Sequence, residues 1–170
     1  MLFEAPQQTD RDASSSLPDY IRHLLSTLSS LLAEPAALPP HLHRLLFSQP
    51  LARQAIINLY PGGTGITPHV DLVGRYADGV VGCSVVGGCV MTFAPTTTSK
   101  GQDRHDVYLP PRTIYVLSGP ARWDWTHGIE PRVEDVVERE DRHLEPETIL
   151  RDLRLSVTFR WLKPGADVLS

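Results

Sequence analysis

The sequence has no excess of basic residues. It contains 16 lysine and arginine residues against 20 aspartate and glutamate residues, which gives a formal net charge of -4 at pH 7. A chain of this charge has no overall positive field to attract it to nucleic acid or to an acidic membrane surface. A nucleic-acid substrate would therefore require a local basic patch, and composition does not locate one.

Cysteine is also scarce, since the chain has only two. Cys83 and Cys89 both lie in the apolar stretch of residues 80–94. There we expect buried, unreactive thiols, and the alternative is a disulfide or a reactive cysteine. Free thiols favour a reducing compartment, so we expect an intracellular protein, either cytoplasmic or nuclear.

The chain lacks a secretory signal and a membrane-spanning run. Its first residues contain no basic segment followed by a long apolar one. The most apolar window, residues 80–94, is interrupted by glycine and is too short to cross a bilayer. The glycines at residues 62–65 lack the Lys-Ser/Thr pair of a phosphate-binding loop, so they predict a flexible loop over a pocket. We expect a soluble protein.

A length of 170 residues with 41% hydrophobic residues suits one core and is too short for two. Residues 1–16 are polar and predict a flexible tail, which leaves residues 17–170 as a single domain. Leucine and isoleucine then recur at intervals of three and four up to Pro35, and this spacing predicts a helix that packs against a sheet. Residues 41–49 predict a short helix or a turn.

Short runs of β-branched and aromatic residues dominate the rest of the sequence. They lie at residues 54–60, 80–86, 89–93, 106–109, 113–117 and 153–161. Several short strands separated by turn residues predict an antiparallel sandwich or barrel. A Gly-Gly turn joins the second and third runs. We expect an exposed hairpin end at residues 96–104 and a charged surface insertion with weak helical spacing at residues 130–152.

One histidine and one aspartate stand two residues apart, at His69 and Asp71. Alternate residues of an extended strand point to the same face, so an imidazole and a carboxylate would lie side by side. His127 is the candidate for a third ligand if both segments belong to one sheet. Two histidines and one carboxylate leave three positions open on an octahedral ion, as in non-haem Fe(II) oxygenases. The spacing alone leaves ordinary polar residues at strand edges as the alternative.

The last predicted strand carries two arginines on one face. Polar and apolar residues alternate along it, with Arg154, Ser156, Thr158 and Arg160 on one side and Leu155, Val157 and Phe159 on the other. Two inward guanidinium groups are costly unless an anion lies between them. Because arginine binds carboxylates through two parallel hydrogen bonds, a dicarboxylate ligand is one interpretation. An edge strand with solvated arginines is the other.

Several short motifs follow one another in the order found in a known enzyme family. They are Asn58-x-Tyr60, Gly65-Ile66-x-x-His69-x-Asp71, Leu109-Pro-x-Arg112, Leu117-Ser-Gly with Ala121-Arg122, Trp125-x-His127-Gly-Ile129 and Arg154-x-Ser-x-Thr-Phe-Arg160. Together they resemble the AlkB-like Fe(II)/2-oxoglutarate-dependent dioxygenases over residues 53–161. The string from Leu-Pro-Pro-Arg to Trp-Thr-His-Gly-Ile looks most like the oxygenase domain of the AlkB homologues that hydroxylate a tRNA wobble uridine.

The resemblance implies a mainly β fold, a double-stranded β-helix or jelly roll, with the N-terminal helix as a buttress. It implies that His69, Asp71 and His127 hold Fe(II) and that 2-oxoglutarate and O2 are the co-substrates.

The same resemblance assigns the 2-oxoglutarate site. Arg154 and Tyr60 would bind the C5 carboxylate, and Asn58 and Arg160 would lie near the C1 end. Ser156 stands where some family members have asparagine, so one co-substrate contact is missing or replaced.

The implied reaction is hydroxylation or oxidative demethylation of a C–H or N-methyl group, with a modified nucleobase of RNA or DNA as the expected substrate. A methylated protein side chain or a small molecule is an alternative substrate. A non-catalytic jelly roll that binds an anion or a partner is an alternative function. We expect Arg75, Tyr76 and Trp123 to stack on a base, although packing in the core or on the surface is the alternative for each.

Overall fold

The computed structural model describes residues 2–4, 17–97, 103–139, 143 and 145–166. Most of the predicted tail, residues 5–16, lies outside these ranges, as does the tip of the predicted hairpin end, residues 98–102. The helices are α1 (Asp19–Leu31), α2 (Pro40–Phe47) and α3 (Pro120–Trp123). The strands are β1 (Leu2–Glu4), β2 (Arg53–Tyr60), β3 (Ile66–His69), β4 (Val80–Val86), β5 (Cys89–Pro95), β6 (His105–Leu109), β7 (Thr113–Leu117), β8 (Trp125–Ile129), β9 (Glu134–Val137), β10 (Glu147–Leu150) and β11 (Arg154–Trp161).

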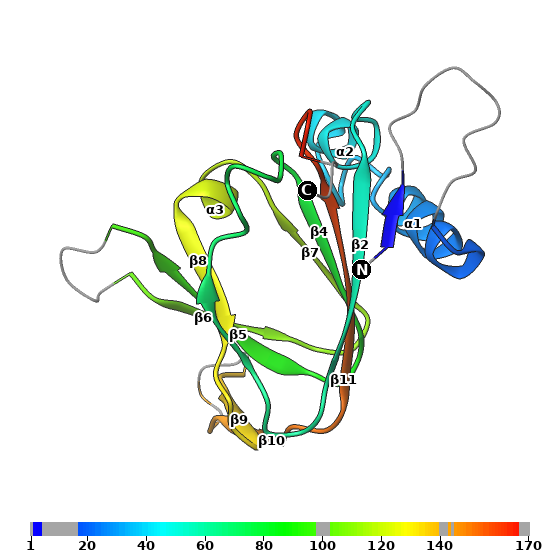
Figure 1. Cartoon of the computed structure of the whole chain (residues 1–170). Helices are drawn as coiled ribbons and strands as arrows, with labels where there is room; N and C mark the ends of the chain where they lie inside the picture. Colours follow the sequence, from blue (N-terminus) through cyan, green and yellow to red (C-terminus); the bar gives the residue numbers. More distant parts are fainter. Residues whose placement is uncertain (1, 5–16, 98–102, 140–142, 144, 167–170) are drawn as a thin grey trace.

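Two antiparallel sheets form the body of the protein (Figure 1). The major sheet has the strand order β1-β2-β11-β4-β7, and the minor sheet has the order β3-β8-β5-β6. Strands distant in sequence are neighbours in both sheets, because the chain passes repeatedly between them. This is the double-stranded β-helix that the sequence predicted.

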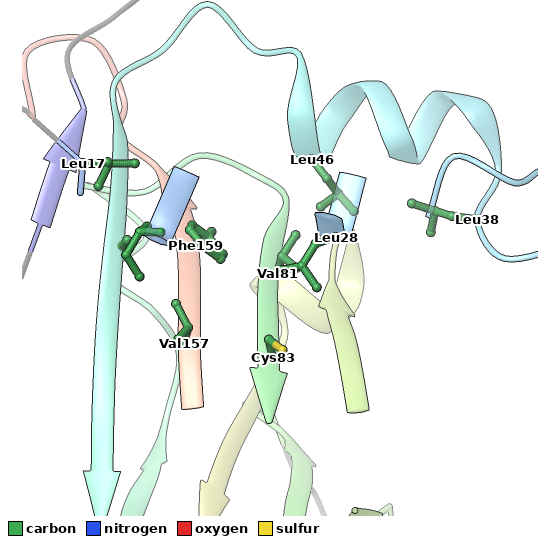
Figure 2. Packing of buried hydrophobic residues seen from close by; sticks show 10 residues of the cluster. Leu17, Leu28, Leu38, Leu46, Val81, Cys83, Val157 and Phe159 are labelled. Carbon is green, nitrogen blue, oxygen red and sulfur yellow. The ribbon is translucent and has the colours of Figure 1, made fainter. Parts of the chain in front are cut away.

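Helices α1 and α2 pack on the outer face of the major sheet. Leu28 of α1 and Leu46 of α2 join Val81 of β4 and Phe159 of β11 in one buried cluster, whose packing Figure 2 shows. Pro18 precedes α1 and Pro40 begins α2, and both prolines suit the first turn of a helix because that turn lacks backbone acceptors for its N–H groups. The predicted N-terminal buttress is therefore confirmed. Within the described ranges, neither helix is long and apolar enough to cross a membrane.

Strand β11 divides its side chains between the two faces of the major sheet as predicted. Val157 and Phe159 belong to the buried cluster under the helices. Arg154, Ser156 and Arg160 line the space between the two sheets. The alternation along one strand therefore supplies both the hydrophobic core and the polar lining of the interior.

Strands β4 and β5 follow each other in sequence but belong to different sheets. They are joined by Gly87 and Gly88, and Gly87 has a φ of 68°, a conformation that side chains rarely adopt. A Cβ atom on Gly87 would also lie 2.4 Å from the carbonyl oxygen of Leu153. The predicted Gly-Gly turn is present, but it carries the chain from one sheet to the other instead of closing a hairpin.

Two expectations for surface segments are wrong in part. The start of the predicted tail is strand β1, in which Leu2 pairs with Ala55 of β2, and Phe3 packs against a small buried cluster around Leu162. Apolar side chains at residues 2 and 3 explain this pairing, which the polar average of residues 1–16 concealed.

The predicted insertion at residues 130–152 contains a two-stranded sheet of β9 and β10 instead of helical turns. Asp135, which is only 1% exposed, accepts hydrogen bonds from the backbone N–H of Val90 at 2.9 Å, from Arg132 Nε at 2.8 Å and from Arg151 Nε at 2.6 Å. This buried carboxylate fastens the segment to β5, so the high charge of the segment is partly structural.

Candidate functional site

A cavity of about 200 Å³ lies between the two sheets. Its lining includes all eight residues predicted to bind metal or co-substrate, namely His69, Asp71, His127, Asn58, Tyr60, Arg154, Ser156 and Arg160. The register explains how the co-substrate residues converge, because Arg154 of β11 is paired with Tyr60 of β2, and Ser156 is paired with Asn58. Residues far apart in sequence are therefore direct neighbours across the major sheet.

The two histidines are paired across the minor sheet. His69 is the last residue of β3 and lies opposite His127 of β8, with 4.5 Å between the ring centroids. The Nδ1 atom of His69 is 2.9 Å from the carbonyl oxygen of Thr67, which makes Nδ1 the protonated nitrogen and leaves Nε2 available to a metal ion. Burial, followed by the nearby His69, lowers the pKa of His127 to about 4, so this ring is neutral at neutral pH. Neutral imidazole is the form that binds a metal.

Asp71 lies beyond the end of β3, so strand alternation does not position it. Arg122 does so, because its Nη1 donates to the Asp71 carbonyl oxygen at 3.0 Å and its Nη2 donates to the Tyr76 carbonyl oxygen at 3.1 Å. The Arg122 side chain is 1% exposed, and it fixes the loop after β3 from α3. The Ala121-Arg122 motif signalled this residue, but its role was not evident from sequence.

The Asp71 carboxylate is 5% exposed and accepts a hydrogen bond from Arg160 Nη1. Arg160 also donates from Nη2 to Gln54 Oε1 at 2.7 Å, and its guanidinium lies 4.0 Å from the centre of the Tyr76 ring. Within the described ranges, His, Cys, Asp and Glu side chains form no preassembled group of three around one point. The two histidines and Asp71 share a cavity and have the donor set of an Fe(II) site, while Asp71 is held by Arg160.

Arg154 has the chemistry expected of an anion site. It is 4% exposed, and its Nε and Nη2 atoms are buried without a hydrogen-bond partner in the described part of the chain. Nη1 donates to Ser156 Oγ at 3.3 Å, and the guanidinium lies 5.5 Å from the Tyr60 ring. A buried charge with two free donors is unfavourable by itself and favourable beside a carboxylate. These residues fit the distal carboxylate of a dicarboxylic acid.

Tyr115 of β7 also lines the cavity, and sequence reasoning did not identify it. Burial raises the pKa of its hydroxyl, so it remains a neutral donor and acceptor. A Cβ atom on Gly82 of the neighbouring strand would lie 2.0 Å from the Tyr115 Cζ atom. Glycine in the middle of a strand was the available signal, since it often marks a close approach by another group.

The residues predicted to stack on a base have different surroundings. Tyr76 is 4% exposed, packs with Ala52 and Leu162, and has Arg160 against its ring. This buried position contradicts its predicted role in stacking. Trp123 is half-buried, with the Arg122 guanidinium 4.2 Å from its ring centre. The roles of Trp123 and of the half-buried Arg75 stay predictions.

Comparison with known proteins places the chain in one family. The family model for the 2OG-Fe(II) oxygenase superfamily matches residues 4–160. A protein of Acanthamoeba polyphaga mimivirus is 31% identical over 137 residues, which are 76% of this chain and 61% of that protein. The tRNA (carboxymethyluridine(34)-5-O)-methyltransferase alkbh8 of Xenopus tropicalis is 39% identical over 85 residues, which are 50% of this chain and 13% of that protein. The chain thus matches less than two thirds of the length of either relative.

Solved structures share the fold at low sequence identity. A prolyl-4-hydroxylase of Pseudomonas putida superposes with a TM-score of 0.51 and 16% identity, covering 96% of this chain and 72% of that chain. The structure of OsALKBH1 gives the same TM-score at 18% identity, covering 88% and 67%. With the family match over most of its length, the chain belongs to the 2OG-Fe(II) oxygenase superfamily, as an AlkB-like dioxygenase that uses Fe(II), 2-oxoglutarate and O2.

Proposed function

We propose that this dioxygenase hydroxylates or oxidatively demethylates a modified nucleobase of RNA or DNA. Two relatives support a nucleic-acid substrate by their names: the Xenopus tRNA methyltransferase and an Arabidopsis thaliana protein described as an alkylated DNA repair protein homologue. This chain matches only 13% and 26% of their respective lengths. Their substrates are therefore a basis for the proposal and for the choice of experiment.

The metal site in this proposal consists of His69, Asp71 and His127. Two imidazoles and one carboxylate suit Fe(II) and leave positions open for other ligands. His69 has its Nδ1 hydrogen held by Thr67, which orients the ring. Arg160 orients the Asp71 carboxylate through one oxygen, which leaves the second oxygen for the metal.

The co-substrate site consists of Arg154, Tyr60, Ser156, Asn58 and Arg160. The buried guanidinium of Arg154 is the observation that carries the proposal, because its Nε and Nη2 atoms have no hydrogen-bond partner among the described residues and suit an anion in the cavity that also contains both histidines. The C5 carboxylate of 2-oxoglutarate supplies that anion, with the Tyr60 hydroxyl as a further donor. The Nε atom of Arg160, which lines the same cavity, is also buried without a hydrogen-bond partner in the described ranges, and it suits the C1 carboxylate.

When bound, Fe(II) with 2-oxoglutarate and O2 supplies an oxidant that breaks a C–H bond, while 2-oxoglutarate becomes succinate and CO2. The protein supplies position and exclusion of water. Ile66, Met91 and Ile129 are among the apolar residues of the cavity wall. Such a wall keeps the reacting groups away from bulk water. Arg154 binds one end of the co-substrate and thereby directs the other end toward the histidines.

Succinate release tests the oxygenase assignment for this chain. The wild-type protein should release succinate from 2-oxoglutarate in the presence of Fe(II), ascorbate and O2. The Asp71→Ala variant should lose this activity, because the carboxylate ligand is gone. Full turnover by the variant, at unchanged Fe(II) affinity, would contradict the proposed metal site. Binding of 2-oxoglutarate by the wild type without any turnover would indicate an anion-binding jelly roll instead.

Mass spectrometry of the products tests the substrate class. Modified oligonucleotides and methylated peptides should be incubated separately with the enzyme, Fe(II), ascorbate and 2-oxoglutarate. We expect a change in the nucleosides only: loss of a methyl group would mean demethylation, and gain of one oxygen atom would mean stable hydroxylation. Oxidation of the peptides alone would exclude the proposed substrate while leaving the oxygenase assignment intact.

A further inference from the structure

Most arginines in the described ranges are neutralised by carboxylates. The ion pairs join Arg22 to Asp19, Arg53 to Glu4, Arg104 to Asp106 and Glu130, Arg132 to Asp135 and Glu130, Arg139 to Glu147, Arg151 to Asp135, and Arg160 to Asp71. Within the described ranges, no such pair involves six cations, namely Arg44, Arg75, Arg112, Arg122, Arg154 and Lys163. Three of the six, Arg75, Arg122 and Lys163, are connected through the Trp123 ring and a backbone hydrogen bond. Charges left unpaired in one place, in a chain of net negative charge, indicate a binding surface.

The backbone holds Arg75 and Lys163 together. The Lys163 N–H donates to the Arg75 carbonyl oxygen at 2.9 Å, next to a bridge between Tyr76 and Leu162. The Lys163 Nζ atom lies 5.3 Å from the centre of the Trp123 ring, and Arg122 lies against the same ring. The Trp123 ring thus brings the Arg122 and Lys163 side chains together, and backbone pairing places Arg75 next to Lys163.

These cations adjoin the catalytic cavity. Arg122 bonds the backbone of Asp71, and Arg160, which lines the cavity, packs on Tyr76 beside Arg75. The carboxylates of Asp71 and Asp78 act electrostatically on Arg122 and partly balance its charge. Of these three neighbours, Arg75 and Lys163 are the two for which the described residues provide no balancing carboxylate. The Nε atom of Arg75 is in addition buried without a hydrogen-bond partner in the described ranges.

Two large apolar side chains are exposed in the loop that follows Asp71 and precedes Arg75 in the sequence. Leu72 is 64% exposed and Val73 is 53% exposed, directly after Asp71. A ligand that suits both features has anionic groups at regular intervals and flat apolar groups between them. Single-stranded nucleic acid has this chemistry, since its phosphates pair with lysine and arginine and its bases cover apolar surface.

We propose that Arg75 and Lys163 form a phosphate-binding site that holds the backbone of a single-stranded nucleic acid beside the catalytic cavity, an inference that rests on the proposed function. Leu72 and Val73 then cover the base next to the one that enters the cavity. The site supplies the local basic patch that a chain of net charge -4 needs in order to bind nucleic acid.

Fluorescence anisotropy with a labelled single-stranded RNA oligonucleotide tests this site. The protein is kept anaerobic with Fe(II) and 2-oxoglutarate so that no turnover occurs. We expect Arg75→Gln and Lys163→Gln each to weaken binding by about 3- to 10-fold at low salt and to reduce the slope of log K against log salt by about 0.7. Lys163→Arg should keep most of the affinity. Arg44→Gln, at an exposed position on α2, should bind like the wild type.

The outcomes separate this proposal from the proposed function. If the Arg75→Gln/Lys163→Gln double variant binds RNA as tightly as the wild type and with the same salt dependence, the phosphate site is wrong and the nucleobase reaction still stands. If the wild type neither binds RNA nor oxidises nucleosides, both fail. Thermal unfolding of each variant checks the fold. If Arg75→Gln lowers stability, Arg75→Lys serves as a second variant, because it keeps the positive charge and should therefore keep RNA binding.

Discussion

Arg154 is the residue of the cavity that we expect to contribute most to the binding of 2-oxoglutarate. We expect Arg154→Ala to raise the apparent KM for 2-oxoglutarate by at least about 30-fold, because loss of a buried carboxylate partner costs about 2–5 kcal/mol. Fe(II) affinity should change little, since Arg154 does not contact the histidines in any hydrogen bond within the described ranges. Initial rates of succinate formation and anaerobic Fe(II) titration measure the two effects.

Arg139→Ala is a suitable control, because Arg139 is exposed and pairs only with Glu147 in the described part of the chain. It should leave both constants unchanged. Equal loss of 2-oxoglutarate and Fe(II) binding in Arg154→Ala would instead indicate that the variant is misfolded, and the assigned role would then lack support.

Gly82 is a position where we expect a single added carbon atom to lower the stability of the protein. In Gly82→Ala the new methyl group would meet the Tyr115 ring, which lines the cavity, so we expect a loss of about 1–3 kcal/mol in the free energy of unfolding. Urea unfolding measures this loss. Gly74→Ala is the matched control, since a Cβ there meets nothing within 4 Å. Equal stability of the two variants would show that Tyr115 does not need the space at Gly82.

Among the elements, β11 is the one that the sequence predicted best. Its alternation correctly assigned Arg154 and Arg160 to the interior and Phe159 to the core under the helices. Strand β3 was predicted less well, because it ends at His69. Asp71 reaches the cavity through Arg122, whose contact with it joins residues 51 positions apart. The alternation along β11 depends on local spacing and is visible in the sequence. The placement of Asp71 depends on a contact with a distant residue, which local spacing does not reveal.

The β9–β10 segment depends on a single buried carboxylate. Burial alone would raise the pKa of Asp135, but hydrogen bonds from Arg151, from the Val90 backbone and from Arg132 outweigh it and lower that pKa. We expect Asp135→Asn to lose about 3–5 kcal/mol of stability at neutral pH, because Arg151 is left buried and unpaired. Glu134→Gln, at an exposed neighbouring position, should change stability by less than about 0.5 kcal/mol.

The pH dependence of this contribution follows from the lowered pKa of Asp135. An unfolded chain titrates this carboxyl at about its ordinary value of 3.8, and the folded protein titrates it lower. The stabilisation is therefore fully present above pH 3.8 and is lost as the pH falls through the folded value. Denaturant unfolding of wild type and Asp135→Asn should converge in acid. A difference in stability that stays constant into acid would contradict the ionised carboxylate.

At the scale of the whole molecule, the candidate site exists only because two sheets face each other. Arg154 belongs to the major sheet and the two histidines to the minor sheet, so 2-oxoglutarate with Fe(II) should link the sheets. We expect anaerobic Fe(II) and 2-oxoglutarate at 100 times Kd to raise the free energy of unfolding by about 2.7 kcal/mol. The Arg154→Ala variant should show little gain at the same concentrations.

Calorimetry under anaerobic conditions measures this stabilisation as an increase in Tm. Fe(II) alone and 2-oxoglutarate alone serve as controls, and each should give less than the pair. If Fe(II) and 2-oxoglutarate raised the Tm of His127→Ala as much as that of the wild type, the co-substrate would bind without the metal site, contrary to the proposed arrangement.

By itself the sequence determined the classes of the elements, the alternation of β11, the buttressing helix and the residue types of the site. These features depend on neighbours along the chain, and their periods of two or about 3.6 residues are visible in one dimension. It misjudged β1 and residues 130–152, where average polarity and charge hid a few apolar side chains and one buried aspartate.

Only the tertiary structure decided which faces meet. It placed β4 and β5 in different sheets, buried Tyr76 under Arg160, held Asp71 through Arg122, and gathered Arg75 with Lys163. Each of these depends on contacts between residues far apart in the chain, and such contacts form where two surfaces fit together. A pattern within one segment records which way its side chains point, but the partner across the interface is set by the packing of the whole molecule.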